Sequence, residues 1–171
     1  IEVQGVGLPA SPGAGQGEVV FSAEDAVAVA EAGRKVMLVR RETSPEDIAG
    51  MNVAQGILTS RGGITSHAAV VARGMGKPCV AGCGDLFVDT AKGEMSIGGK
   101  DFKAGDWITI NGTNGAVIDD KPALVPPHMD DPNLMTVMGW ADETRRLKVR
   151  TNADTPHDAR QAREFGAQGI G

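Results

Sequence analysis

The residues best suited to chemistry lie together in the first half of the chain, where residues 62–67 are Gly-Gly-Ile-Thr-Ser-His. Glycines let the backbone approach a ligand closely, hydroxyl groups donate hydrogen bonds to oxyanions, and a neutral imidazole is a nucleophile or proton carrier. Such a set suits phosphoryl transfer. A histidine at this position can also be a structural hydrogen-bonding residue, so His67 has two interpretations at this point.

The residues around His67 predict a helix. Thr65 is the expected N-cap, because its side-chain oxygen can accept a hydrogen bond from a free N–H of the first turn. Gly74 or Gly76 provides the left-handed end, and Pro78 prevents a restart. Four small or apolar residues at helical spacing are expected to be buried: Ala68, Val71, Ala72 and Met75.

His67 is therefore expected in the first helical turn, with the tip of the helix exposed. A helix N-terminus carries roughly half a positive charge and unpaired N–H groups. This disfavours an imidazolium, so we expect His67 to be neutral and nucleophilic at neutral pH. The same groups attract an anion, and phosphate is the common one.

The elements before this helix alternate between strand and helix, which indicates an α/β fold. A turn-rich loop is predicted over residues 9–15. Lys35–Val39 is almost continuously apolar, so we expect a central strand. The other expected strands are 2–7, 17–21 and 56–59, and the expected helices are 22–32, capped by Ser22, and a short one from Ser44-Pro45.

The pattern after Gly82 changes to short strands separated by turns, as in a β-rich second half of the same domain. Strands are expected at 86–89, 94–97, 106–110 and 115–118. Asn111-Gly112 and Asn114-Gly115 fit a hairpin. Residues 102–106 are predicted to form a turn before a strand.

The first domain is expected to cover residues 1–120. Residues 121–146 are interpreted as a linker around Pro126-Pro127 followed by a connector helix from Asp131, whose apolar face needs a partner. Residues 147–171 predict a strand, a helix opened by Thr155-Pro156 and ended by Gly166, and the start of another strand.

The composition and charge limit the classes of partner that the chain is expected to bind. A net charge of −5 without a Lys/Arg cluster argues against nucleic acid. Neither an apolar run of about 20 residues nor a secretory signal is present, so no membrane partner and a cytoplasmic location are expected. Cys79 and Cys83 lack further ligands nearby for zinc, and reduced thiols are favoured over a disulfide. We assign no catalytic role to His128 and His157.

The string from Gly62 to Val80 resembles the phosphohistidine signature of the PEP-utilising enzyme family, most closely in its pyruvate, phosphate dikinase form. Related strings occur in phosphoenolpyruvate synthase and in enzyme I of the sugar phosphotransferase system. Residues 7–14 resemble the opening of the dikinase central domain, and residues 147–171 resemble the first β/α unit of its carboxy-terminal barrel.

The resemblance implies a swivelling β/β/α phosphohistidine domain, a linker helix and an incomplete first unit of a TIM barrel. The histidine of such a domain shuttles a pyrophosphoryl or phosphoryl group between an ATP-grasp domain and a barrel that binds PEP or pyruvate. The reversible reaction is ATP + pyruvate + phosphate to AMP + PEP + diphosphate. Mg²⁺ is implied at the partner domains and no metal in this chain, and the parent enzyme is implied to be a homodimer. We expect this chain to be a fragment that is inactive in full turnover.

By the same resemblance, His67 is the phosphohistidine, modified on its tele nitrogen, Nε2. Thr65 matches a regulatory phosphorylation target of plant relatives. Arg73 either contacts the phosphoryl group or compensates the helix C-terminus, and Arg61 is a second cation at the rim. The implied phosphate-stabilising residues are Gly62, Gly63, Thr65, Ser66 and Arg73.

Two alternatives remain open from the sequence. The same histidine carrier occurs in phosphoenolpyruvate synthase, which uses water where the dikinase uses phosphate. A protein of a different class, a non-catalytic β-rich binding module, would contain His67 as a structural residue.

Overall fold

The computed structural model describes residues 2–126 and 130–171, and the chain divides into two compact units, one up to Leu124 and one from Val125. The elements of the first unit are β1 (Val3–Val6), β2 (Leu8–Ser11), β3 (Ala14–Val20), α1 (Ala23–Glu31), β4 (Val36–Arg40), the 3-10 helix η1 (Pro45–Asp47), α2 (Ile48–Val53), β5 (Gly56–Thr59), α3 (His67–Met75), β6 (Cys79–Ala81), β7 (Phe87–Asp89), β8 (Glu94–Ile97), β9 (Lys100–Lys103), β10 (Trp107–Asn111) and β11 (Ala116–Ile118).

A mixed sheet forms the centre of this unit, with the strand order β1-β11-β10-β3-β4-β5-β6-β2. The four strands β3, β4, β5 and β6 are parallel, and the flanking pairs are antiparallel. The first four residues of β4 and all of β5 are buried, which is why both are nearly continuous apolar runs. The predicted mixed α/β class and the central position of β4 are confirmed.

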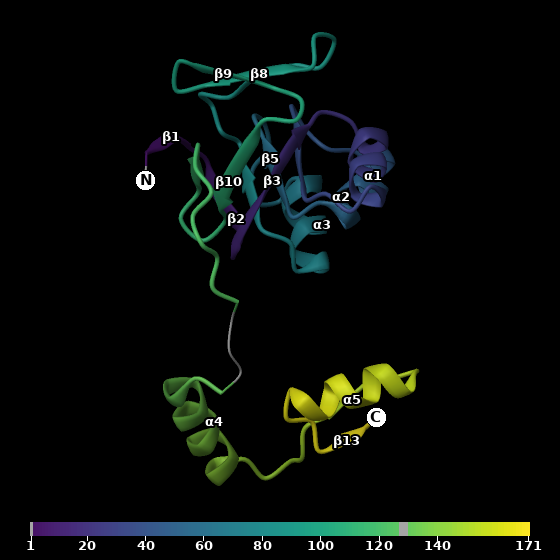
Figure 1. Ribbon diagram of the computed structural model, residues 1–171. Helices are drawn as coiled ribbons and strands as arrows, with labels where there is room; N and C mark the ends of the chain where they lie inside the picture. Colours follow the sequence, from purple (N-terminus) through teal and green to yellow (C-terminus); the bar gives the residue numbers. More distant parts are fainter. Residues whose placement is uncertain (1, 127–129) are drawn as a thin grey trace. The chain divides into compact units, whose positions relative to one another are not determined.

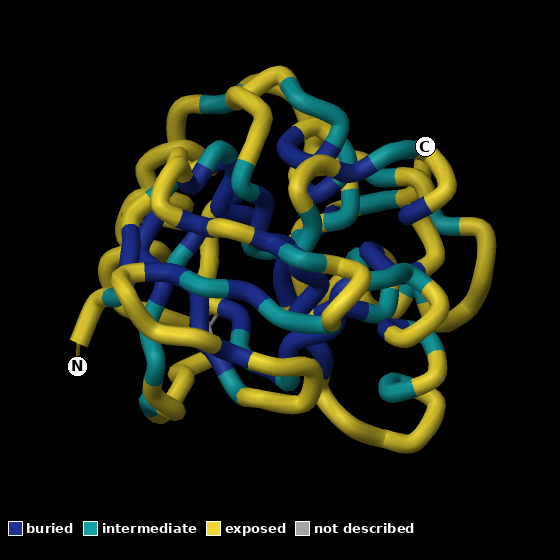
Figure 2. Tube along the Cα trace, turned by 90° about the horizontal axis from the view of Figure 1, so that it is seen from above, coloured by how far each residue is buried: buried dark blue, intermediate teal, exposed yellow. Residues whose placement is uncertain are grey.

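Each face of the sheet carries its own core. Leu38 and Ile57 face the helices, where they pack with buried alanines of α1 and α3. Met37 and Leu58 face the opposite way, toward the three-stranded sheet β7-β8-β9. Figure 1 shows α1, α2 and α3 together on one side of the sheet, and the buried segments are dark blue in Figure 2. Alternating strand residues therefore stabilise two layers at once.

Two helix starts in this unit follow the predicted chemistry. Ser22 caps α1 and accepts a hydrogen bond from the Asp25 amide. Ser44 precedes Pro45 and forms a capping box with Asp47, whose carboxylate also lies 3.4 Å from Nε of Arg40. The second cap fixes the chain that leaves β4.

Two predictions about turns were wrong, at residues 9–15 and 102–106. The Pro-rich stretch 9–15 is not only a loop, because β2 occupies Leu8–Ser11 and pairs with β6 at the edge of the sheet, where a proline is tolerated. The predicted turn at 102–106 begins too early, since β9 extends to Lys103. Phe102 is buried in the core, and a single apolar residue is too weak a periodic signal to predict such a strand.

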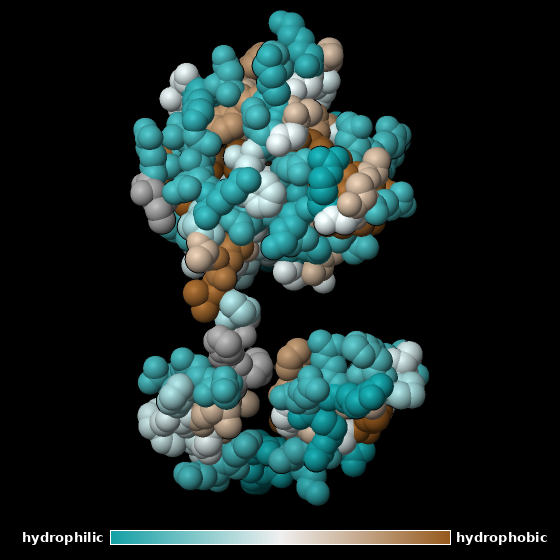
Figure 3. Space-filling model, viewed as in Figure 1, coloured by the Kyte–Doolittle hydropathy of each residue, from teal (hydrophilic) through white to brown (hydrophobic). Residues whose placement is uncertain are grey.

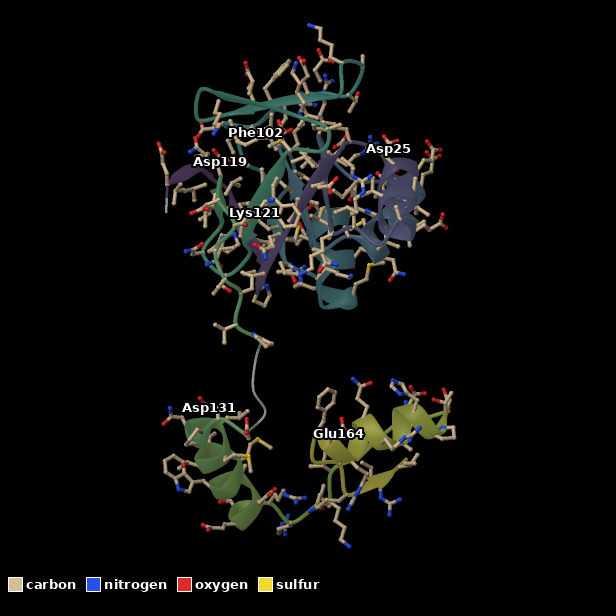
Figure 4. All side chains as sticks on the ribbon, viewed as in Figure 1. Asp25, Phe102, Asp119, Lys121, Asp131 and Glu164 are labelled. Carbon is tan, nitrogen blue, oxygen red and sulfur yellow. The ribbon has the colours of Figure 1, made fainter. Side chains whose placement is uncertain are left out.

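The second unit contains α4 (Pro132–Thr144), β12 (Arg150–Thr151), α5 (Pro156–Glu164) and β13 (Gly169–Ile170), with β12 parallel to β13. Asp131 caps α4, as predicted, by accepting hydrogen bonds from the next residues of the helix (Figure 4). Thr155 caps α5 as predicted, and Gly166 has a φ of 89° just past its end. Of the predicted linker, Pro127 and His128 lie outside the described residues.

The face of the first unit that Figure 3 shows is mostly hydrophilic. Among residues 2–126 and 130–171, no helix has the length and apolar character needed to span a membrane.

Candidate functional site

His67 is the first residue of α3, at the exposed tip of the helix. The N-cap is Ser66 and not Thr65, which corrects the prediction: Ser66 Oγ accepts a hydrogen bond from the Ala69 amide at 3.4 Å. The physical reason is the turn before the helix, in which the Ser66 amide donates to the Gly63 carbonyl at 3.0 Å. This turn leaves Ser66 extended, as a cap requires, and leaves the Thr65 side chain exposed.

The body of α3 is firmly held. Gly76 ends it with a φ of 65°, so of the two predicted glycines Gly76 provides the left-handed cap. Ala68 and Ala72 are buried as predicted, and Val71 and Met75 are partly buried against the same core. A fixed helix presents His67 in a defined position.

Among the described residues, the imidazole of His67 has one hydrogen-bond partner. Its Nδ1 lies 2.8 Å from Oγ1 of Thr43 and is hydrogen-bonded to it. Thr43 is only 8% exposed and lies in the segment between β4 and η1. The sequence analysis missed Thr43, because only the sheet order shows that β4 and β5 are neighbouring parallel strands whose following segments meet at one edge of the sheet.

This hydrogen bond gives the two ring nitrogens different roles. A neutral imidazole carries its proton on one nitrogen and a lone pair on the other. In the tautomer in which Nδ1–H donates to Thr43, the lone pair is on Nε2. The half-buried ring can then act as a nucleophile through Nε2.

Two glycines shape the loop that precedes His67. Gly62 has a φ of 104°, and a Cβ there would lie 2.8 Å from Cβ of Ser66. A Cβ on Gly82 would lie 2.4 Å from the Gly62 carbonyl oxygen, so the loop after β6 packs tightly against this turn. Gly63 has open space where a Cβ would be. Gly62 is thus required for the turn, and Gly63 leaves room beside the helix tip.

The guanidinium of Arg73 is hydrogen-bonded to two backbone carbonyls. It donates hydrogen bonds to the Ala10 carbonyl at 2.8 Å and to the Ile64 carbonyl at 2.7 Å. Arg73 therefore connects α3 to β2 and to the loop before His67. Its contact with a phosphoryl group stays a prediction.

The cysteines are buried and free. Burial raises the pKa of the Cys79 thiol to about 12, opposed by the Arg73 charge, and burial together with the Asp85 carboxylate raises the pKa of Cys83. Burial also lowers the pKa of Lys77, whose ammonium donates to the Ala54 carbonyl. Within the described part of the chain, His, Cys, Asp and Glu side chains form no group of three or more suited to a metal.

Comparison with known proteins shows what the segment around this site is similar to. Residues 32–115 match the family described as PEP-utilising enzyme, mobile domain. The chain is 58% identical over 169 residues to a chloroplastic pyruvate, phosphate dikinase of Flaveria pringlei, covering 99% of this chain and 18% of the relative. It is 54% identical over 170 residues to a pyruvate, phosphate dikinase of Rhizobium meliloti, covering 99% of this chain and 19% of the relative. The matched segment lies within the first unit and contains His67, and it confirms the resemblance to the PEP-utilising enzyme family seen in the sequence.

The chain spans less than a fifth of the length of these relatives. A solution structure of Enzyme I is 26% identical and covers 63% of this chain and 38% of that chain, with a TM-score of 0.35.

Proposed function

We propose that this chain is the phosphohistidine carrier of a pyruvate, phosphate dikinase, and that His67 is phosphorylated on Nε2. The observation that carries the proposal is the hydrogen bond between Nδ1 and the buried Thr43 hydroxyl at the tip of α3. The bond fixes the ring and directs the free nitrogen away from its partner. The similarity to dikinases supplies the reaction class.

The transfer step follows from this geometry. Nε2 attacks a phosphorus atom of the donor, a nitrogen–phosphorus bond forms, and the bond from phosphorus to the leaving oxygen breaks. Positive charge develops on the ring, and Thr43 Oγ1 accepts a hydrogen bond from Nδ1–H throughout. The second transfer reverses the attack, with an acceptor oxygen displacing Nε2.

The developing phosphate charge needs donors near the helix tip. The free amides at the N-terminus of α3 are positive in character. The exposed Thr65 hydroxyl and the space beside Gly63 suit an incoming phosphate, and Ser66 contributes by capping. We assign Gly62 and Arg73 to holding the loop in position. Exposure of Thr65 also suits its proposed role as a regulatory phosphorylation site.

The substrates and partners of the complete enzyme belong to the proposal. In it, an ATP-grasp domain provides ATP, a barrel provides pyruvate or PEP, and these domains bind Mg²⁺. We interpret residues 1–120 as the swivelling domain, 121–146 as linker and connector helix, and 147–171 as the start of the barrel. We also propose a homodimeric, cytoplasmic parent enzyme, and no full turnover by this chain alone.

The test uses the 171-residue chain mixed with separately produced nucleotide and barrel domains of a dikinase and ATP labelled in the β-phosphate. We expect an acid-labile, alkali-stable label on the chain, abolished by His67→Ala and unchanged by His157→Ala, a control at an exposed histidine of the second unit. Circular dichroism should show His67→Ala folded, since the residue lies at a helix tip. A label that survives in folded His67→Ala would contradict the proposal.

The choice between dikinase and phosphoenolpyruvate synthase depends on the acceptor of the terminal phosphate. The named relatives favour the dikinase.

A further inference from the structure

A hollow of about 290 Å³ lies in the first unit where β4 and β5 end. Arg41, Ser60 and Arg61 line one part of it, and the rest is lined by Gly84, Leu86, Phe87 and Val88. Phe87, at its edge, is 63% exposed. The sequence analysis treated Arg61 only as a rim cation, and the proposed function uses neither arginine.

The charge in this hollow is positive. The lining contains two arginines and no carboxylate. Nε of Arg41 donates to the Val88 carbonyl at 3.1 Å, which fixes the side chain near β7. Among the described residues, no ion pair involves Arg41 or Arg61. The exposed acids Glu42 and Asp85 lie next to lining residues in the sequence but do not line the hollow.

Backbone contacts join the hollow to the His67 site. The Arg61 amide donates to the Arg41 carbonyl at 2.8 Å, and the buried Thr59 hydroxyl donates to the Arg61 carbonyl at 2.8 Å. Thr43, the partner of His67, follows Arg41 by two residues. The two arginines therefore lie on the same pair of connected loops as the nucleophile.

We propose that this hollow is a second phosphate-binding site of the domain, in which Arg41 and Arg61 hold a phosphate group of the ligand that donates to or accepts from His67. The inference rests on the proposed function. Guanidinium groups bind phosphate oxygens in a two-pronged geometry and stay charged at all relevant pH values. The Ser60 hydroxyl adds a polar group at the same place.

The test is a titration of the ¹⁵N-labelled chain with pyrophosphate, followed by NMR. We expect saturable shifts of the amides of residues 60–62 and 84–88 and of the arginine Nε signals. Arg61→Gln should weaken binding about tenfold, because a charge-assisted pair is lost. The matched control is Arg34→Gln, which removes the same charge at the other end of β4, where Arg34 is paired with Glu18. Its affinity should stay within about twofold, since distant surface charges are screened.

Further ligands, a pH series and further variants distinguish the possible results of this titration. Inorganic phosphate and ATP distinguish a free anion from a nucleotide phosphate as the source, and ATP should add shifts at Phe87. Affinity should rise from pH 5.5 to 7.5, as the phosphate groups of these probes lose a further proton and gain negative charge. His67→Ala should retain binding, so that failure of the labelling test leaves this site standing. Unchanged binding in a folded Arg41→Gln/Arg61→Gln variant, equal weakening by Arg34→Gln, or loss of binding in His67→Ala would overturn the inference.

Discussion

The two units of the chain use the same local signals but differ in what they bury. Both begin their helices with side-chain caps, at Ser22 and Ser66 in the first unit and at Asp131 and Thr155 in the second. The first unit has a buried core on each face of its sheet. In the second, α4 and α5 contain no buried residue.

The second unit leaves many large apolar side chains exposed: Val125, Leu134, Met135, Val137, Met138, Trp140, Leu147, Val149, Phe165 and Ile170. Caps each contribute about 1 kcal/mol, whereas burial of one large side chain contributes about 1.5–3 kcal/mol. The comparison teaches that caps determine where helices begin, and that burial determines whether they are stable.

The largest expected difference between the units is in hydrogen exchange. Amides of β4 and β5 should exchange only by global unfolding, whereas α4, 13 residues long and without buried residues, should open locally. We expect protection factors at least about a thousandfold higher in the central strands. Mass spectrometry of exchanged peptides measures this, and equal protection of α4 would contradict the comparison.

A matched pair of leucines gives the next largest effect. Leu58 is fully buried in β5 and Leu147 is 83% exposed. Leu58→Ala should lower the free energy of unfolding by about 3–5 kcal/mol through lost burial and a cavity. Leu147→Ala should change it by less than about 0.5 kcal/mol. Urea unfolding of the two variants checks this, and similar losses would mean that the second unit has a core of its own.

A matched pair of glycines gives a smaller effect and reports on the site. Gly82 has a φ of 59° and its Cβ would collide with the Gly62 carbonyl, whereas Gly166 has a φ of 89° and open space. Gly82→Ala should cost about 2–4 kcal/mol and displace the His67 loop. Gly166→Ala should cost about 1 kcal/mol. Thermal unfolding gives the energies, and NMR shifts of the His67 ring should change only in Gly82→Ala.

The last effect concerns pH and is confined to alkaline solution. Cys79, in the first unit, has a pKa raised from 9.0 to about 12 by burial. The folded chain therefore keeps a proton that the unfolded chain loses above pH 9, so the free energy of unfolding should fall as pH rises from 9 toward 12. The slope from this group is at most about 1.4 kcal/mol per pH unit.

Alkylation of the thiols provides the measurement. Iodoacetamide at pH 8 should label neither cysteine until the first unit unfolds, because the reactive form is the thiolate. Cys79→Ala should flatten the pH dependence between 9 and 12. Rapid labelling of the folded chain would contradict the buried state.

The sequence predicted the elements whose signals are local. The run Val36–Val39, the cap at Ser44 and the stop at Gly76 each have a local physical cause, and each appears in the structure. Strand β2 was missed because its pairing with β6 is a long-range contact that the turn-forming residues conceal.

In the candidate site, too, the features with local signals were predicted and those that depend on long-range contacts were not. The position of His67 at the start of α3 follows from neighbouring residues, although the cap moved from Thr65 to Ser66 because two adjacent hydroxyls compete for one role. Thr43 could not be assigned to His67 without the sheet order. The backbone contacts of Arg73 with Ala10 and Ile64 were hidden for the same reason.

The most direct measurement of the central claim is ¹⁵N and ³¹P NMR of the chain with ¹⁵N-labelled histidine rings, before and after phosphorylation by the missing domains. The account predicts that Nδ1 of His67 carries the proton in the unmodified neutral ring, and that phosphorus then couples to Nε2. A phosphate on Nδ1, or on any residue other than His67, would contradict it.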